Sequence, residues 1–210
     1  DIEGGDVDVD MLVTSAYKWY GPHLGILFGK EALLERLPAY KVRPAHDRYE
    51  TGTQNFEAMA GTLATIDYLQ DLGRRFGSAD PAHAAGRRSQ LASAFGVIAA
   101  HEEQLATRLL EGLAAIPGVR VWGVTGTASR TARTPTVGIT LAGVPPREAA
   151  TALGTAGIFA WDGDFYARAL IERLGLGDRG GVLRLGLVHY NTLAEVERVL
   201  GAVEALVSAR

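Results

Sequence analysis

The spacing of apolar and polar residues along the chain predicts a mixed α/β protein. Short apolar runs bounded by Gly, Pro or charged residues are typical of strands, and here they cover Met11–Ser15, Gly25–Phe28, Val119–Val124, Thr136–Leu141, Gly157–Trp161 and Val182–His189. Longer segments with apolar residues three or four positions apart are typical of helices, and here they cover Phe56–Leu72, Gly86–Ile116, Pro146–Gly154 and Leu193–Ser208.

The order of these elements predicts two parts joined by a long helix. The helix expected over residues 86–116 ends at Pro117-Gly118. Beyond it, the order β-β-α-β-β-α suggests a small α/β domain over residues 117–210. Residues 1–85 form the other part, with a loop rich in Pro, Gly and charge at about 37–55 and a helix start favoured by Pro81.

Composition limits the classes of function. The chain has 210 residues, is 47% hydrophobic and carries a net charge of −3. We therefore expect a real core and neither nucleic acid nor a membrane as a partner. Without a membrane-spanning run or a signal peptide, the default is a soluble cytoplasmic protein. Cysteine is absent, which removes disulfides, thiolate metal sites and any cysteine nucleophile; no metal site is expected.

The first residues read as an internal connection. The chain opens on Asp1, and Ile2, Val7 and Val9 alternate with aspartates before the first strand. We expect that a substantial N-terminal portion precedes this sequence in the natural protein.

The first segment with chemical potential is Thr14-Ser15-Ala16-Tyr17-Lys18-Trp19-Tyr20-Gly21-Pro22. A lysine that forms a Schiff base must sit on a rigid element, and a strand end followed by a glycine turn provides one. Ser15, three residues before Lys18, could donate its hydroxyl to a phosphate oxygen. The alternative is a solvated surface lysine in a tight turn, which is common for any single lysine.

Two further segments follow. Glu50-Thr51-Gly52-Thr53-Gln54-Asn55 precedes a helix and suits either an anion or an ordinary helix cap. Arg184 lies on an apolar strand in Arg184-Leu185-Gly186-Leu187-Val188-His189-Tyr190-Asn191-Thr192. Its planar fork fits a carboxylate, and the alternative is an ion pair with one of the 24 acidic residues.

Together these segments resemble the cysteine-desulfurase group of the class V aminotransferases. The order S-x-x-K-x-x-G-P, E-x-G-T-x-N and R-x-x-x-x-x-Y-N-T is similar to that of the group and runs from about Asp8 to the C-terminus. The resemblance implies a partial α/β fold of the pyridoxal 5′-phosphate (PLP) fold type I transferases. Residues 1–85 would be the C-terminal part of the PLP-binding large domain, and residues 117–210 the small C-terminal domain.

The resemblance also implies roles for single residues. Lys18 would carry the cofactor, and Ser15, Gly52 and Thr53 would hold its phosphate. Thr53 would reach the partner subunit's cofactor in a homodimer with shared active sites, and Arg184 would bind the carboxylate of a small amino-acid substrate.

The sequence departs from the group at two positions. Tyr17 stands where desulfurases usually have a histidine that contacts the phosphate, so the contact is altered or made by the phenol. The desulfurase stretch similar to G-I-x-x-R-x-G-H-H-C-A here reads Gly157-Ile158-Phe159-Ala160-Trp161-Asp162-Gly163-Asp164-Phe165-Tyr166-Ala167, which puts Tyr166 at the cysteine position. A phenol is mostly protonated at neutral pH and cannot accept sulfur as a persulfide. Tyr166 is a candidate acid/base or substrate-gating residue, or it packs structurally.

The expected function is therefore that of a PLP-dependent transferase or lyase on the desulfurase-like branch. The resemblance also places an aspartate that pairs with the pyridine nitrogen and a histidine that stacks on the ring upstream, outside this sequence. One alternative is a truncated, non-catalytic remnant that serves as a dimerisation or binding module. The other is an unrelated α/β binding protein. Trp161, Asp162 and Asp164 line a pocket entrance or form a solvated turn, and His23 and His189 are expected to be structural.

Overall fold

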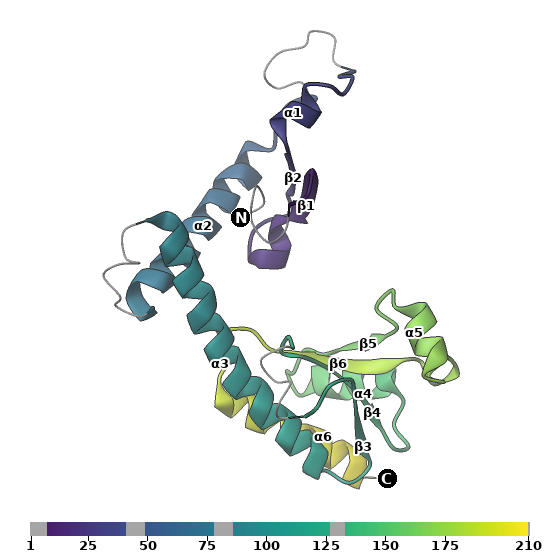
Figure 1. Cartoon of the computed structure of the whole chain (residues 1–210). Helices are drawn as coiled ribbons and strands as arrows, with labels where there is room; N and C mark the ends of the chain where they lie inside the picture. The colour runs from purple at the N-terminus through teal and green to yellow at the C-terminus, as the bar shows by residue number, and fades with distance from the viewer. Residues whose placement is uncertain (1–7, 41–48, 78–85, 127–132, 210) are drawn as a thin grey trace. The chain divides into compact units, whose positions relative to one another are not determined.

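The computed structural model describes residues 8–40, 49–77, 86–126 and 133–209. The chain divides into two compact units, residues 1–94 and 95–210, and Figure 1 shows the elements of each. The mixed α/β class expected from the sequence is confirmed. None of the helices in these ranges is long and apolar enough to cross a lipid bilayer.

The first unit is built on a β-hairpin and a long helix. Strands β1 (Met11–Ser15) and β2 (Gly25–Gly29) pair antiparallel, from Met11 opposite Gly29 to Ser15 opposite Gly25. A 3-10 turn (Ala16–Trp19) follows β1, and a short helix α1 (Glu31–Leu34) follows β2. Helix α2 (Phe56–Phe76) begins at Asn55, whose side chain accepts a hydrogen bond from the Ala58 N–H, a typical N-cap.

Helix α3 (Arg87–Ala115) starts in the first unit, where it crosses α2. Gln70 Nε2 donates to Gln90 Oε1 at 2.6 Å. A Cβ atom added to Gly73 would lie 1.8 Å from the carbonyl oxygen of Gln90 and 3.1 Å from the Ala94 nitrogen. The crossing therefore needs a residue without a side chain at position 73.

The second unit is a four-stranded antiparallel sheet in the order β3-β4-β6-β5. Its strands are β3 (Val119–Trp122), β4 (Thr136–Leu141), β5 (Trp161–Gly163) and β6 (Val182–Gly186). Its helices are the remainder of α3, α4 (Pro146–Thr155), α5 (Arg168–Arg173) and α6 (Leu193–Ser208).

The pleat of the strands gives this sheet two different faces. Val137, Ile139 and Leu183 point to the side of α3, α4 and α6, and they join one large core with buried side chains of those helices. The opposite face carries a smaller cluster of Ile171, Leu176 and Val182 around α5. Arg184 therefore emerges on the side away from the main core, although Leu183 and Leu185 beside it are buried.

The expected elements of this unit differ from the observed ones in several places, and β3 ends at Trp122 instead of Val124. The strand expected at 157–161 is β5 at Trp161–Gly163, and Phe159 is 94% exposed. Strand β6 ends at Gly186, before residues 187–189. Helix α5 was not expected at all, because its six residues are too few to show a period. The helix start expected at Pro81 lies outside the described residues.

We expect the substitution Gly73→Ala to destabilise the first unit by about 1–3 kcal/mol, because the added methyl group would overlap the backbone of α3. Unfolding by urea, followed by circular dichroism, measures the change. Gly96→Ala is the matched control, since this helical glycine has nothing within 4 Å of an added Cβ. It should be neutral or stabilise by up to about 1 kcal/mol. Equal stability of the two variants would contradict the close crossing.

Candidate active site

Two backbone hydrogen bonds close the turn that carries Lys18. The N–H of Ala16 donates to the carbonyl of Leu24 at 2.8 Å, and the N–H of Gly21 donates to the carbonyl of Ala16 at 2.9 Å. Ala16 is fully buried, and a Cβ atom at Gly21 would lie 2.9 Å from the Ala16 Cβ. The turn is thus fixed by a small buried residue and a glycine, which leaves Lys18 exposed at its outer side.

Helix α2 packs against this turn. The hydroxyl of Thr65 donates to the carbonyl of Gly61 at 3.0 Å and lies 3.4 Å from that of Tyr20. Pro22 packs on Gly61, where an added Cβ atom would be 3.3 Å from the proline ring. Tyr20 ends the 3-10 turn with φ 74°, a left-handed conformation that is uncommon for a non-glycine residue. The lysine is therefore held on a rigid element, as a Schiff-base lysine requires.

The side chains of the turn converge on the phenol of Tyr17. Lys18 Nζ donates to Tyr17 Oη at 3.1 Å and lies 4.5 Å from the centre of the tyrosine ring. The hydrogen bond from Lys18, together with one from the Ser15 side chain, holds the pKa of the Tyr17 phenol below its usual value. The ring of His23 is 5.0 Å from that of Tyr17. The sequence-predicted residues Ser15, Tyr17 and Lys18 thus form one hydrogen-bonded group.

Gly52 and Thr53 lie in the turn before α2. Both are exposed, and Gly52 has φ 73°. No contact found among the described residues joins either of them to the Lys18 turn. Asn55 of the same motif caps α2, so this motif contains at least one structural residue, and the phosphate role of Thr53 stays a prediction.

Arg184 lies on the face of the second unit's sheet that carries α5 and its small cluster, away from the main core. Its guanidinium carbon is 4.3 Å from the centre of the Phe165 ring. Within the described residues no acidic side chain forms an ion pair with Arg184, and its role as a carboxylate ligand stays a prediction.

The turn after β5 has a strained backbone. Phe165 and Tyr166 have φ values of 53° and 63°, and the Tyr166 N–H donates to the Asp164 carboxylate at 3.0 Å. The Tyr166 side chain is fully exposed. Asp162 pairs with Arg147 of α4 at 3.2 Å. Both aspartates of this stretch therefore have structural partners, and Phe165 is the residue of the turn that contacts Arg184.

Asn191 and Thr192, at the end of the segment that begins with Arg184, form hydrogen bonds in the loop after β6. Asn191 Oδ1 accepts from the Val188 N–H at 2.9 Å, and Thr192 and Glu195 form a capping box at the start of α6. The carbonyl of Asn191 contacts His101 Nε2 at 2.9 Å. Burial, and secondarily the charge of His101, lowers the pKa of His189. The His189 ring lies edge-on to that of Tyr190, with 5.3 Å between the ring centres, and its structural role stays a prediction.

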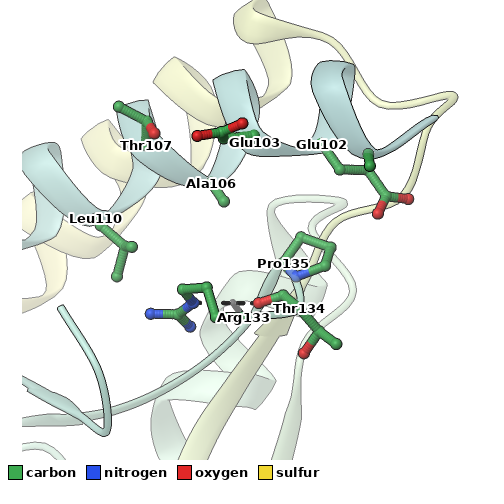
Figure 2. A pocket seen from close by; sticks show the side chains of 9 residues that line it. Glu102, Glu103, Ala106, Thr107, Leu110, Arg133, Thr134 and Pro135 are labelled. Carbon is green, nitrogen blue, oxygen red and sulfur yellow. Dashed lines mark hydrogen bonds between the residues drawn. The ribbon is translucent and has the colours of Figure 1, made fainter. Parts of the chain in front are cut away.

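A separate cavity of about 250 Å³ lies between α3 and the segment that leads into β4 (Figure 2). Glu102 and Glu103 line its helical side, and Arg133 lines the other. Burial raises the pKa of Glu102. The guanidinium of Arg133 donates to the carbonyls of Val124, Thr134 and Thr136, so it holds its own loop. None of the sequence-predicted site residues lines this cavity.

Comparison with known proteins identifies the family. The profile described as "Aminotransferase class-V" matches residues 2–92 and 89–199, and the chain belongs to this family. Its members include cysteine desulfurases and use PLP. The family suggested by the three motifs is therefore confirmed.

Relatives and solved structures agree with this assignment. The chain is 31% identical to "Aminotransferase-like protein FGM3" of Gibberella zeae, over 97% of this chain and 47% of that protein. It is 27% identical to a cysteine desulfurase of Synechococcus elongatus, over 95% of this chain and 30% of that protein. The cysteine desulfurase CsdA of Escherichia coli is 26% identical, with a TM-score of 0.71 over 97% of this chain and 47% of that one.

An apo cysteine desulfurase of Thermococcus onnurineus NA1 shares the fold, with a TM-score of 0.77 at 24% identity over 97% of this chain and 48% of that one. The chain thus spans about half the length of these two structures and of the Gibberella relative, and it has the corresponding part of the PLP fold type I architecture.

We expect Lys18→Met to raise the pKa of Tyr17 towards that of an ordinary phenol, because the largest cause of its lowering is the hydrogen bond from Lys18. A spectrophotometric pH titration of the tyrosinate band, with Tyr17→Phe to assign the change, measures this pKa. Lys30→Met is the matched control, because Lys30 pairs with Asp8 and not with Tyr17. An unchanged Tyr17 pKa in Lys18→Met would show that the lysine does not contact the phenol.

Proposed function

We propose that this chain is part of a PLP-dependent enzyme that acts on a small amino acid, with Lys18 as the cofactor-carrying residue. The observation that carries the proposal is the group formed by Lys18, Tyr17 and Ser15 on a turn held by α2, in a chain of the class V aminotransferase family.

The donor set on this turn fits PLP. An exposed amine on a rigid turn can react with the cofactor's aldehyde, and the Ser15 hydroxyl can donate to a phosphate oxygen. Gly52 and Thr53 supply an exposed backbone and a hydroxyl for the phosphate of a cofactor in the partner subunit. Binding of the partner subunit's cofactor by Gly52 and Thr53 requires a homodimer, and we include that homodimer in the proposal.

PLP, when bound, withdraws electrons from the bonds at the substrate's Cα atom. The residues of this chain then have separate tasks. The Lys18 amine moves the proton at Cα, and the Tyr17 phenol accepts a hydrogen bond from that amine and orients it. Arg184 binds the substrate carboxylate through its planar fork. Tyr166, fully exposed at its turn, serves as an acid/base or gating residue.

The reaction differs from standard desulfuration. The chain contains no cysteine, so it offers no thiolate to receive sulfur as a persulfide. Elimination, transamination and racemisation all use an amine at Cα and a carboxylate-binding arginine. The proposed reaction belongs to this group of transferase and lyase chemistries, on the desulfurase-like branch of the family.

A second candidate function is a non-catalytic dimerisation or binding module. The observation that favours it is the apolar surface of the β1–β2 hairpin, where Val13 and Leu27 lie opposite each other and are 73% and 52% exposed. Apolar side chains on a two-stranded sheet are typical of a surface that another polypeptide covers.

We expect the purified protein to develop the long-wavelength absorption band of lysine-linked PLP when PLP is added, and Lys18→Ala to lose this band. Lys30→Ala, which changes a partly exposed lysine of the same unit, should keep it. Absence of the band in the wild-type protein at every PLP concentration would favour the binding-module function instead.

Arg184→Ala should weaken amino-acid binding by roughly tenfold to a hundredfold, because a charged hydrogen-bonding partner of the carboxylate is lost. PLP binding, followed by the same absorption band, should change little. Titration of the PLP-loaded protein with small amino acids measures both. Loss of folding in Arg184→Ala, seen by circular dichroism, would instead mean that the arginine is structural.

A further inference from the structure

Arg184 lies in a row of four residues that crosses the sheet on the face away from the main core. The register places Trp122 of β3 opposite Gly138 of β4, Gly138 opposite Arg184 of β6, and Arg184 opposite Trp161 of β5. Side chains at paired positions of antiparallel strands share a face. The arginine therefore has a glycine on one side and an exposed tryptophan on the other.

The glycine leaves room for a ligand beside Arg184. A Cβ atom added at Gly138 would meet only Val182, whose nearest atom would be 3.5 Å away. Apart from the Val182 side chain, no atom of the described residues lies within 4 Å of that Cβ position, so the place beside the arginine on β4 has room for a small group. A carboxylate can approach the arginine from this side.

The guanidinium of Arg184 lies over the ring of Phe165. The ring centre is 4.3 Å from the guanidinium carbon, a distance at which a cation and an aromatic face attract each other. A guanidinium carries five N–H donors in a planar fork, and among the described residues no hydrogen bond or ion pair occupies those of Arg184. These groups stay available for a two-point contact with a carboxylate.

The position of Phe165 is itself fixed by its surroundings. The ring packs against the cluster of Ile171, Leu176 and Val182. The left-handed backbone at Phe165 and Tyr166 turns the chain so that the first ring faces the sheet, while the second is fully exposed. Strained backbone persists where surrounding contacts hold it and is concentrated at functional sites.

We propose that Phe165 is a positioning residue for substrate binding: its ring holds the Arg184 guanidinium in place on the face of the sheet that also carries Gly138, ready to bind a carboxylate. This inference rests on the proposed role of Arg184 as the carboxylate ligand. Holding the arginine in its binding conformation before the ligand arrives reduces the entropy lost on binding. The aromatic ring, rather than its volume, supplies the effect.

The test uses nuclear magnetic resonance of the isotope-labelled 210-residue chain, with sodium acetate as the probe. The Arg184 Nε–H signal is assigned by its loss in Arg184→Lys. In the wild-type chain this signal should be displaced by the ring current of Phe165 and should shift on titration with acetate. Neither readout depends on PLP or on enzyme activity.

Phe165→Leu should remove the ring-current displacement and weaken acetate binding at Arg184 by about two- to fivefold, the range expected for an exposed cation–π contact. Phe165→Tyr, which keeps a ring, should restore both. Phe159→Leu is the matched control, because Phe159 is 94% exposed and is not in contact with Arg184. It should behave like the wild-type chain.

Two results would overturn the proposal. One is acetate affinity in Phe165→Leu equal to that of Phe159→Leu. The other is a failure of Phe165→Tyr to bind better than a Phe165→Leu variant that circular dichroism shows to be folded. If the leucine variant does not fold, acetate affinity of Phe165→Tyr well below that of Phe159→Leu overturns the proposal instead. An Arg184 signal that does not respond to acetate in the wild-type chain would refute the carboxylate role itself. The PLP absorption band tests the cofactor role of Lys18 independently.

Discussion

The closure of the turn around Ala16 is the constraint on which the proposed chemistry depends. Ala16 is buried, and its N–H and carbonyl both hydrogen-bond within the turn. A larger residue at position 21 would clash with Ala16, because an added Cβ atom would lie 2.9 Å from the Ala16 Cβ and 3.0 Å from its carbonyl oxygen. This packing separates the buried backbone of the turn from the exposed side chains of Tyr17 and Lys18. The backbone of Lys18 is thus held in place, while its side chain stays accessible to a ligand.

In the second unit a strand, rather than a turn, holds the candidate functional side chain in place. Alternation along β6 buries Leu183 and Leu185 in the main core and directs Arg184 to the opposite face. The hydrophobic effect on one side of the sheet therefore determines the position of a charge on the other. The contact with Phe165 then restricts the conformations of the Arg184 side chain. In both units, an apolar contact orients a polar group.

Much of this architecture could be predicted from the sequence because local signals were strong. The strand at Met11–Ser15 and the helix at Leu193–Ser208 have the expected bounds, since a short apolar run marks the first and a capping residue, Thr192, begins the second. The strand expected at 157–161 was wrong, because an apolar run there does not reveal that Phe159 faces solvent. The contact of Phe165 with Arg184 could not be predicted. It joins residues of a turn and a strand, and no local pattern signals it.

The most direct test of the central claim, that Lys18 carries PLP, is chemical. The protein is incubated with PLP, reduced with borohydride so that a lysine-linked cofactor becomes permanent, digested, and analysed by mass spectrometry. The account predicts that the pyridoxyl adduct is on the peptide that contains Lys18 and that its yield falls to background in Tyr17→Phe/Lys18→Arg. An adduct spread over Lys30 and Lys41 as much as over Lys18 would contradict it, because Lys18 would then be only one accessible amine among the lysines of the chain.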